Sequence, residues 1–355
     1  MLTANDVKVL ARETGFDLCG IAQAEAFPEL RFLDDWLERG YAGEMHYMAR
    51  TARRRRDVRE VVPLARSVVS LATLYNTDNP YSTELDDPAE AKISRYAWGA
   101  DYHDVLQRRT ETLLNRMRAA STVEFDARCY VDTGPVQERV YAQYAGLGWI
   151  GKNTCLIHPE RGSWFFLSEI ITTLTLEADS PQLDQCGTCT LCLEACPTDA
   201  LRTPGVLDST RCLSYLTIEL RGSIPESKRA ALEHHVYGCD ICQDVCPYNA
   251  ASLSSDDPAW QPRPEFDRPT LVALWRRSDS ELDQQFKASA MSRVGLIGFR
   301  RNVAVALGNV GTQEAASALD EPAAPGTVSR RDPTVAEHVA WAHARLSDCS
   351  SRKQS

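Results

Sequence analysis

The stretch CGTCTLCLEACP, residues 186–197, decides how its part of the chain folds. Its four cysteines follow the spacing Cys-x2-Cys-x2-Cys-x3-Cys-Pro, in which three thiolates hold one [4Fe-4S] cluster and the fourth reaches a second cluster. The short gaps let a tight loop wrap three corners of an iron-sulfur cube. The longer step before Cys196 turns that thiolate away from the first cube. The stretch therefore predicts a module that binds two clusters.

A second run, CDICQDVCP at residues 239–247, completes the predicted module. A full copy of the first run would need a cysteine at position 236, which is Val236, and Cys212 lies between the two runs as its substitute. The eight ligands then sort four and four. Cluster one takes Cys186, Cys189, Cys192 and Cys246, and cluster two takes Cys196, Cys212, Cys239 and Cys242. The exchanged fourth ligand would hold the clusters close enough for electron transfer.

Two zinc ions with four thiolates each are the alternative for the same cysteines. The two Cys-Pro endings and the spacing favour the clusters. Clustered cysteines in a cytosolic chain indicate metal rather than disulfides. The remaining four match no ligand spacing and are expected to be buried small side chains or free thiols: Cys19, Cys129, Cys155 and Cys349.

The composition predicts a soluble, multidomain protein. The chain has 355 residues, of which 43% are hydrophobic and 25% charged, enough to bury two or three cores. No apolar run of about 18 residues predicts a membrane span. The N-terminus lacks an apolar signal, and the arginine run at 53–56 lies too deep for a twin-arginine leader, so a cytoplasmic location is expected. The net charge of -10 argues against a generally basic nucleic-acid surface.

Hydrophobic periodicity predicts a mixed α and β architecture. Helices are expected at 5–14, 102–119 and 135–145, the last with Pro135 at its first position, and strands at 16–22, 67–74, 124–131 and 164–176. This alternation predicts an α/β domain over residues 1–177, followed by the cysteine module at 178–255. Residues 252–269 are rich in Ser, Asp and Pro and resemble a linker. Residues 256–355 form the third predicted region, with Ala/Leu-rich helices over 270–345 and one segment, 299–311, typical of a HEAT hairpin. The role of residues 312–355 stays open.

Four blocks of the chain resemble one family, the epoxyqueuosine reductases. The blocks are RYAWGADYH at 95–103, YVDTGPVQERVYAQYAGLGWIGKNT at 130–154, RCLSYLTIE at 211–219 and GCDICQDVCPYN at 238–249. The resemblance extends from about residue 5 to about residue 310 and is loose beyond Gly311.

The resemblance implies an activity, cofactors and partners. The family reduces the epoxide of epoxyqueuosine at the tRNA wobble position to queuosine, the last step of tRNA queuosine biosynthesis, with cobalamin that receives electrons from two [4Fe-4S] clusters. It implies a nitroreductase-like cobalamin-binding domain at 1–177, a ferredoxin-like domain at 178–255 and a HEAT-like region at 256–355. The expected partners are a tRNA with a queuosine-type anticodon stem-loop and an external low-potential electron donor. A monomer is the default expectation.

Asp132 is the general acid that the resemblance implies. Epoxide removal needs two electrons, a proton for the oxygen and eventual loss of water. Asp132 follows a predicted strand on a turn, where catalytic groups are often displayed. A carboxyl enclosed against a corrin would have a raised pKa. The structural alternative is that Asp132 caps a helix that starts at Pro135.

A set of cobalamin contacts is also expected, each with ordinary packing or solvation as its alternative. By resemblance, one of two neighbouring arginines, Arg55 or less favourably Arg56, would lie at the cobalamin. The further expected contacts are Asp132, Lys152, Asn153, Ser168, Ser214, Tyr215 and Gln243.

The letters of G-x-G-x-x-G occur at Gly146, Gly148 and Gly151. A dinucleotide fingerprint needs a strand before it, and the preceding residues predict a helix, so that interpretation fails. The glycines are expected to allow close approach of a large flat ligand, or to form a plain turn. The Asp101-Tyr-His103 sequence resembles the start of D-x-H-x-x-G, but the sixth position is Leu106. A histidine ligand below cobalt is therefore not predicted, and His103 is expected to be a structural hydrogen-bonding residue.

Two basic groups are candidates for a surface that faces tRNA. The first comprises Arg50, Arg53 to Arg56 and Arg59, and the second Arg293, Arg300 and Arg301. A solvated basic face is the alternative. Two other functions stay open at this point: another cobalamin-dependent reductase, such as a dehalogenase, and a ferredoxin-type carrier without a substrate of its own.

Overall fold

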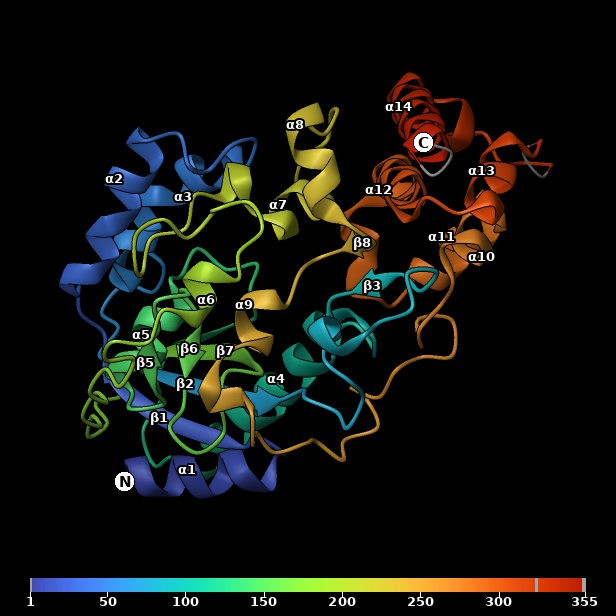
Figure 1. Cartoon of the computed structure of the whole chain (residues 1–355). Helices are drawn as coiled ribbons and strands as arrows, with labels where there is room; N and C mark the ends of the chain where they lie inside the picture. Colours follow the sequence, from blue (N-terminus) through green and yellow to red (C-terminus); the bar gives the residue numbers. More distant parts are fainter. Residues whose placement is uncertain (1, 323–324, 353–355) are drawn as a thin grey trace.

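The computed structural model describes residues 2–322 and 325–352, with side chains described up to residue 347 (Figure 1). A four-stranded sheet organises the N-terminal part, in the order β1-β2-β7-β4, with each neighbouring pair antiparallel. Its strands are β1 (Leu18–Gln23), β2 (Ser67–Leu74), β4 (Ala127–Tyr130) and β7 (Phe165–Thr172). All four predicted strands are confirmed, although β4 and β7 are shorter than expected. The side chain of Cys349 lies outside the described part.

Helices cover both faces of this sheet. Those that pack on it are α1 (Ala4–Glu13), α4 (Tyr102–Ala120) and α5 (Glu138–Tyr144). Because side chains alternate along a strand, Ile170 of β7 packs with the α1 and α4 side, whereas Ile171 packs with α5. Glu169 shares the face of Ile171, so its side chain points toward α5.

The expected start of α5 is wrong. The helix begins at Glu138, and its N-cap is Gln137, whose side chain makes no capping hydrogen bond. Gln137 Nε2 instead donates to the carbonyls of Leu30 and Arg55. These tertiary bonds hold the segment that contains Pro135 against its neighbours rather than in a helical turn. Asp132 therefore does not cap α5, and that structural alternative is excluded.

Short elements connect the sheet to the cysteine module. Helices α2 (Phe32–Glu38) and α3 (His46–Arg56) precede α5 in the sequence. The hairpin of β5 (Trp149–Ile150) and β6 (Leu156–Ile157) follows it. The module itself contains α6 (Leu191–Glu194), α7 (Leu213–Ile218), α8 (Glu226–Arg229), β8 (His235–Tyr237) and α9 (Ile241–Asp244). Strand β3 (Lys92–Ile93) pairs in parallel with β8, which links the first domain to the module.

The C-terminal region is helical, as predicted. Its helices are α10 (Leu271–Arg276), α11 (Asp279–Phe286), α12 (Gly295–Val310), α13 (Gln313–Asp320) and α14 (Pro333–Arg352), and they gather at the end of the molecule far from α1 (Figure 1). Helices α12 and α14 approach closely at Gly308, where an added Cβ would lie 2.7 Å from the Cα of Ala342. The expected linker packs on the first domain, since Trp260 is only 2% exposed within the core beneath α4. No helix in the described ranges combines the length and apolar character that a membrane span requires.

Arg300 and Arg301 do not form a tRNA-facing surface, so that expectation is wrong. The side chains of these two arginines, which both belong to α12, are fully buried. Arg300 donates to the backbone carbonyl of Trp275 at 2.6 Å. Arg301 donates to the carbonyls of Leu216 and Gly222 at 2.8 and 2.6 Å. A sequence-adjacent basic pair thus holds α12 to its neighbours, because the long side chains supply donors for carbonyls that no backbone N–H reaches.

Replacing Arg301 by Leu is expected to destabilise the docking of the helical region by about 3 kcal/mol, because several buried carbonyls lose their donor. Thermal and urea unfolding, followed by tryptophan fluorescence, would measure the change. The control is Arg276→Leu, which removes an exposed arginine that pairs with Glu321 and should change the transition little. Equal effects of both variants would contradict the assigned role of Arg301.

Candidate active site and cluster module

Asp132 lies in a strained turn directly after β4. Its φ of 54° is in the left-handed region, which is uncommon for a residue with a side chain and concentrates at functional sites. Its backbone N–H donates to Glu138 Oε1 at 2.6 Å. Its own carboxyl group remains 58% exposed. The turn therefore presents an accessible carboxyl group, while the hydrogen bond to Glu138 fixes its backbone.

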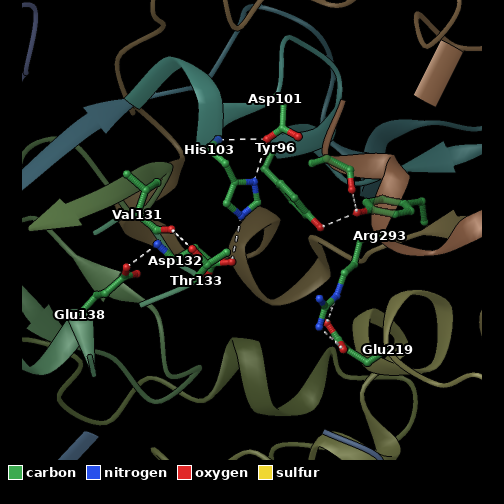
Figure 2. A network of polar contacts seen from close by, with 11 residues as sticks. Tyr96, Asp101, His103, Val131, Asp132, Thr133, Glu138, Glu219 and Arg293 are labelled. Carbon is green, nitrogen blue, oxygen red and sulfur yellow. Dashed lines mark hydrogen bonds and ion pairs between the residues drawn. The ribbon is translucent and has the colours of Figure 1, made fainter. Parts of the chain in front are cut away.

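His103 joins Asp132 to a second carboxylate (Figure 2). Its Nε2 lies 3.2 Å from Asp132 Oδ2, and its Nδ1 lies 2.7 Å from Asp101 Oδ1. Asp101 also caps α4 by accepting the backbone N–H of His103 at 3.0 Å. The ring of Tyr102 stacks on the imidazole with centroids 4.0 Å apart. His103 is hydrogen-bonded, as expected, but its second partner places it in the candidate site.

The pair of His103 and Asp132 holds a proton at neutral pH. Partial burial opposes protonation of His103, but the hydrogen bonds to Asp101 and Asp132 outweigh it and raise its pKa to about 9. For Asp132, enclosure favours the neutral form, but the contact with His103 dominates and lowers its pKa. The expected raised pKa of Asp132 is therefore not found in the chain itself. The proton resides on the imidazole, within reach of the carboxylate.

Arg55, rather than Arg56, lies against the Asp132 turn. Arg55 Nη1 donates to the carbonyl of Val136 at 2.9 Å. Arg56 points elsewhere, to an ion pair with Asp34. Of the two arginines that the sequence left open, the structure brings Arg55 to the site.

Lys152, Asn153 and Gln243 lie at the junction of the first domain with the cysteine module. Lys152 Nζ donates to the carbonyls of Gly187 and Cys189 at 2.7 and 2.8 Å. Asn153 is 4% exposed, and its Nδ2 donates to the carbonyl of Cys242 at 3.1 Å. Gln243 Nε2 donates to the backbone and side-chain oxygens of Ser163. These three residues therefore lie around the loops that carry the cluster cysteines.

The remaining predicted contacts are more scattered. The hydroxyl of Tyr215 accepts the backbone N–H of Glu44 at 2.8 Å, and Ser214 precedes it on α7, partly exposed. Ser168 is 1% exposed and its hydroxyl accepts a hydrogen bond from Thr110 of α4 at 3.1 Å. Ser168 thus lies on the α4 face of the sheet, which the structure does not bring together with the other candidates.

The three glycines make room for the chain itself rather than for an added ligand. An added Cβ at Gly148 would lie 2.2 Å from the carbonyl oxygen of Ile157, and one at Gly146 would lie 2.8 Å from that of Ser180. The helix α5 precedes them, which confirms that this is no dinucleotide fingerprint. The plain-turn interpretation fits, because Gly146 and Gly148 pack against backbone of this chain and Gly151 packs against the side chains of Ile157 and Asn153.

The first set of predicted cluster ligands gathers as expected. Burial raises the pKa of Cys192 to about 11, and the neighbouring thiols of Cys246, Cys186 and Cys189 act in the same direction. Cys246 is thus close to the first run although it comes from the second. This placement agrees with the exchange of the fourth ligand that the spacing predicts.

The second set gathers around Cys239. Burial raises the pKa of its thiol, and the nearby thiols of Cys212 and Cys196 add to the effect. Cys242 in turn is close to Cys239 and Cys212. Cys212, the substitute for a cysteine at position 236, lies where the sequence places it. The donor chemistry of both sets fits thiolate-bound iron-sulfur clusters.

Three cysteines outside the sets have different surroundings. Burial raises the pKa of Cys19 and of Cys129 to about 12, as for inert core thiols. Cys155 instead contacts Cys242. No group of His, Cys, Asp or Glu in the described part of the chain has the geometry of a single-ion site.

Two carboxyl residues of the site were missed by sequence reasoning. Glu138 accepts the Asp132 N–H, and Glu169 lies fully buried beneath it on β7. The available signal was the sequence of β7, FFLSEIIT, where one glutamate interrupts a buried apolar strand.

Comparisons with known proteins agree with these observations. The family described as "4Fe-4S double cluster binding domain" matches residues 185–249, and the family described as "Epoxyqueuosine reductase QueG" matches residues 55–133. The described helix-and-sheet chain therefore contains a double-cluster domain that includes residues 185–249.

Several curated relatives share the family name. An epoxyqueuosine reductase of Xanthomonas campestris is 40% identical over 96% of this chain and 95% of its own length. That of Gloeobacter violaceus is 46% identical over 87% of this chain and 97% of its own.

Solved structures agree as well. A crystal structure of epoxyqueuosine reductase with an epoxyqueuosine-modified tRNA-Tyr stem loop has a TM-score of 0.85 at 32% identity, covering 96% of this chain and 89% of that one. The structure from Streptococcus thermophilus has a TM-score of 0.79 at 27% identity and covers 99% of both chains. The conclusion is that this chain belongs to the epoxyqueuosine reductase family.

Proposed function

We propose that this chain reduces the epoxide of epoxyqueuosine in tRNA to the alkene of queuosine, with electrons that pass through its two [4Fe-4S] clusters. The observation that carries the proposal is the proton-holding pair of His103 and Asp132, set beside the cluster module. Helix α5 links this pair to the cluster module. Arg139, next to Glu138, donates to the carbonyl of Thr154 at 2.7 Å, and the neighbouring Asn153 bonds the carbonyl of Cys242.

The balance of the reaction defines what the residues must supply. An epoxide, two electrons and two protons give an alkene and one water molecule. Asp132 receives the proton held on His103 and delivers it to the epoxide oxygen as the carbon–oxygen bond breaks. Asp101 keeps the imidazole oriented through its 2.7 Å contact.

Cobalamin is the cofactor proposed to act between the clusters and the substrate. When bound, it supplies a reduced cobalt centre that delivers electrons to carbon. The open side of Asp132, whose carboxyl is 58% exposed, leaves space in front of the acid. Groups from two distant parts of the chain border it, because Tyr47 of α3 and Arg293 of the C-terminal region both lie near enough to Asp132 for electrostatic interaction.

The residues proposed to hold the cofactor differ in how well the geometry supports them. Arg55 and Asp132 have the strongest support, because they meet at one turn. Three others line the junction with the clusters: Lys152, Asn153 and Gln243. Ser214 and Tyr215 of α7 have weaker support, and the geometry does not favour Ser168. We propose a nitroreductase-like first domain and a HEAT-like C-terminal region for the finer fold, within the boundaries 1–177, 178–255 and 256–355.

The activity test uses reduced, reconstituted holoenzyme and tRNA that carries epoxyqueuosine. Mass spectrometry of the digested tRNA should show loss of one oxygen atom from the modified base, dependent on cobalamin and on an added low-potential donor. An unchanged base with fully reduced cofactors would contradict the proposal. That result would favour one of the two other functions, a reductase with another substrate or an electron carrier.

Helix α3 carries the surface proposed to meet tRNA. Three of its neighbouring arginines are engaged in ion pairs, Arg53 with Glu60, Arg56 with Asp34 and Arg59 with Asp57. Arg50 and Arg54 are exposed and make no ion pair with a residue that the structure describes. These two are therefore available for phosphate.

Reversing both charges, Arg50→Glu with Arg54→Glu, is expected to weaken stem-loop binding at least about tenfold. It should also reduce the slope of log affinity against log salt by about 1.5, two phosphate contacts being lost. Fluorescence anisotropy at several salt concentrations would measure both. The matched control, Arg12→Glu with Arg118→Glu, makes the same net charge change on α1 and α4. Equal weakening by the control pair would show a general charge effect and contradict the assigned surface.

A further inference from the structure

Glu169 is a buried carboxyl group without a donor. It lies in the middle of β7, between Ser70 of β2 and Tyr130 of β4 in the sheet register, and is 0% exposed. No hydrogen-bond donor in the described part of the chain reaches either of its carboxyl oxygens. An ionised carboxylate in such a place would cost several kcal/mol, as uncompensated buried charges do.

The group that Glu169 does contact is another carboxyl. Glu169 points from the face of the sheet that α5 covers, and its carboxyl group lies near enough to that of Glu138, the first residue of α5, for the two groups to interact. Two ionised carboxylates can only accept hydrogen bonds, so a hydrogen bond between them requires one shared proton. Glu138 is the partly exposed member, and it faces the site, whereas Glu169 lies in the sheet beneath.

Glu138 is at the same time the group that fixes the turn of Asp132. Glu138 Oε1 accepts the backbone N–H of Asp132 at 2.6 Å. Asp132 is the residue whose φ is 54°. Such a backbone conformation persists only where surrounding contacts impose it. The orientation of Glu138, and with it the turn, depends on the partner beneath.

We propose that Glu138 and Glu169 form a carboxyl pair that shares one proton and holds the Asp132 turn in the conformation that serves catalysis. The inference rests on the proposed role of Asp132 as the proton donor. Both glutamates are positioning residues, which act through Asp132 and do not touch the substrate.

The ionisation of the pair agrees with this arrangement. Burial raises the pKa of Glu138 to about 7, and the negative charge of Asp132 adds to the effect. Burial, and then the proximity of Glu138, raises the pKa of Glu169 further. Among the residues that the structure describes, the guanidinium groups of Arg139 and Arg55 face Glu138 and oppose these shifts. Near neutral pH and above it, the pair therefore retains a proton that ordinary glutamates have lost.

The test compares two replacements of the buried member. In Glu169→Gln the amide N–H takes the place of the shared proton and still donates to Glu138. In Glu169→Leu the side chain has similar bulk but no donor, so Glu138 loses its partner. We expect kcat of Glu169→Gln to stay within about threefold of the wild type and that of Glu169→Leu to fall at least about tenfold. The KM for tRNA and the affinity for cobalamin should change little in both, because neither residue contacts a ligand.

Infrared spectroscopy of the full chain tests the shared proton without turnover. The wild type should show the carbonyl band of a protonated carboxylic acid at pH 8, where solvent-exposed glutamates are ionised, and Glu169→Gln should lack it. Glu138→Ala, at a partly exposed helix start that tolerates substitution, should lower kcat like Glu169→Leu even if the latter folds poorly.

Two results would overturn the inference: absence of the band in the wild type, or equal loss of kcat in Glu169→Gln and Glu169→Leu. Failure of the proposed function would look different. The wild type would then leave the modified base unchanged, while the infrared band at pH 8 would still be present and Glu169→Gln would still remove it.

Discussion

Replacement of Asp132 by Asn is expected to reduce kcat about 10²- to 10⁴-fold, the usual contribution of a positioned general acid. Asparagine keeps the size of the side chain and can still contact His103, but it has no proton to give to the epoxide oxygen. The turn should survive, because it is the Asp132 backbone N–H that binds Glu138. Single-turnover reduction of epoxyqueuosine in tRNA, followed by mass spectrometry, would measure the effect.

The control for this change is Asp104→Asn. Asp104 is an exposed aspartate in the first turn of α4, one residue after His103, and should be replaceable without loss. Cobalamin absorbance and iron content should match the wild type in both variants. Full activity of Asp132→Asn would remove the assignment of Asp132 as the acid.

The pH profile of the wild type follows from the same pair. The pKa of His103 is raised to about 9, so the folded chain retains this proton across neutral pH and loses it as the pH rises through about 9. We therefore expect kcat to decline as the pH rises through that range. Stability should decline there too, because a raised histidine pKa favours the folded state only while the proton is bound. A rate that increases through pH 9 would contradict proton delivery by this pair.

Replacement of Cys212 by Ala is expected to abolish turnover, because cluster two loses a ligand and the path of electrons is interrupted. The iron content should fall from about eight atoms per chain toward about four, since each cluster holds four irons. Anaerobic reconstitution with iron and sulfide, followed by iron analysis and visible absorbance, would measure it.

The informative control is Cys155→Ala. Cys155 contacts Cys242, so its thiol is the alternative to Cys212 as the fourth ligand of cluster two. Iron content near eight in Cys155→Ala, against about four in Cys212→Ala, is the expected outcome. The reverse result would exchange the two cysteines in the ligand set, and zinc in place of iron in the wild type would remove the proposed source of electrons.

The cluster ligands were predictable because their chemistry is local. Thiolates that wrap one corner of a cube must be two or three residues apart, and this spacing is visible in the sequence. Counting also predicted that Cys246 joins the first run, since four ligands per cluster must be found among eight, and the structure places its thiol near that of Cys192. The strand β2 was equally clear, because its apolar run is bounded by turn residues on both sides.

The start of α5 and the orientation of the basic groups were not local properties. A proline in a polar turn is typical of a helix start, but Gln137 and Arg55 bind the segment from outside the helix. Arg300 and Arg301 have the composition of a basic surface. Their burial depends on carbonyls of distant segments, which no window of the sequence contains.

The sequence by itself determined the two-cluster module, the two runs of cysteines predicted to bind the clusters, and the position of the turn after β4 that contains Asp132. The tertiary structure alone decided which groups meet at that turn. His103 reaches Asp132 only because α4 and β4 pack on the same sheet, and Glu169 reaches Glu138 only because the register of β7 places it under the first residue of α5. Spacing along the chain encodes contacts between near neighbours. Contacts between distant residues depend on strand register and helix packing, which the whole core determines together.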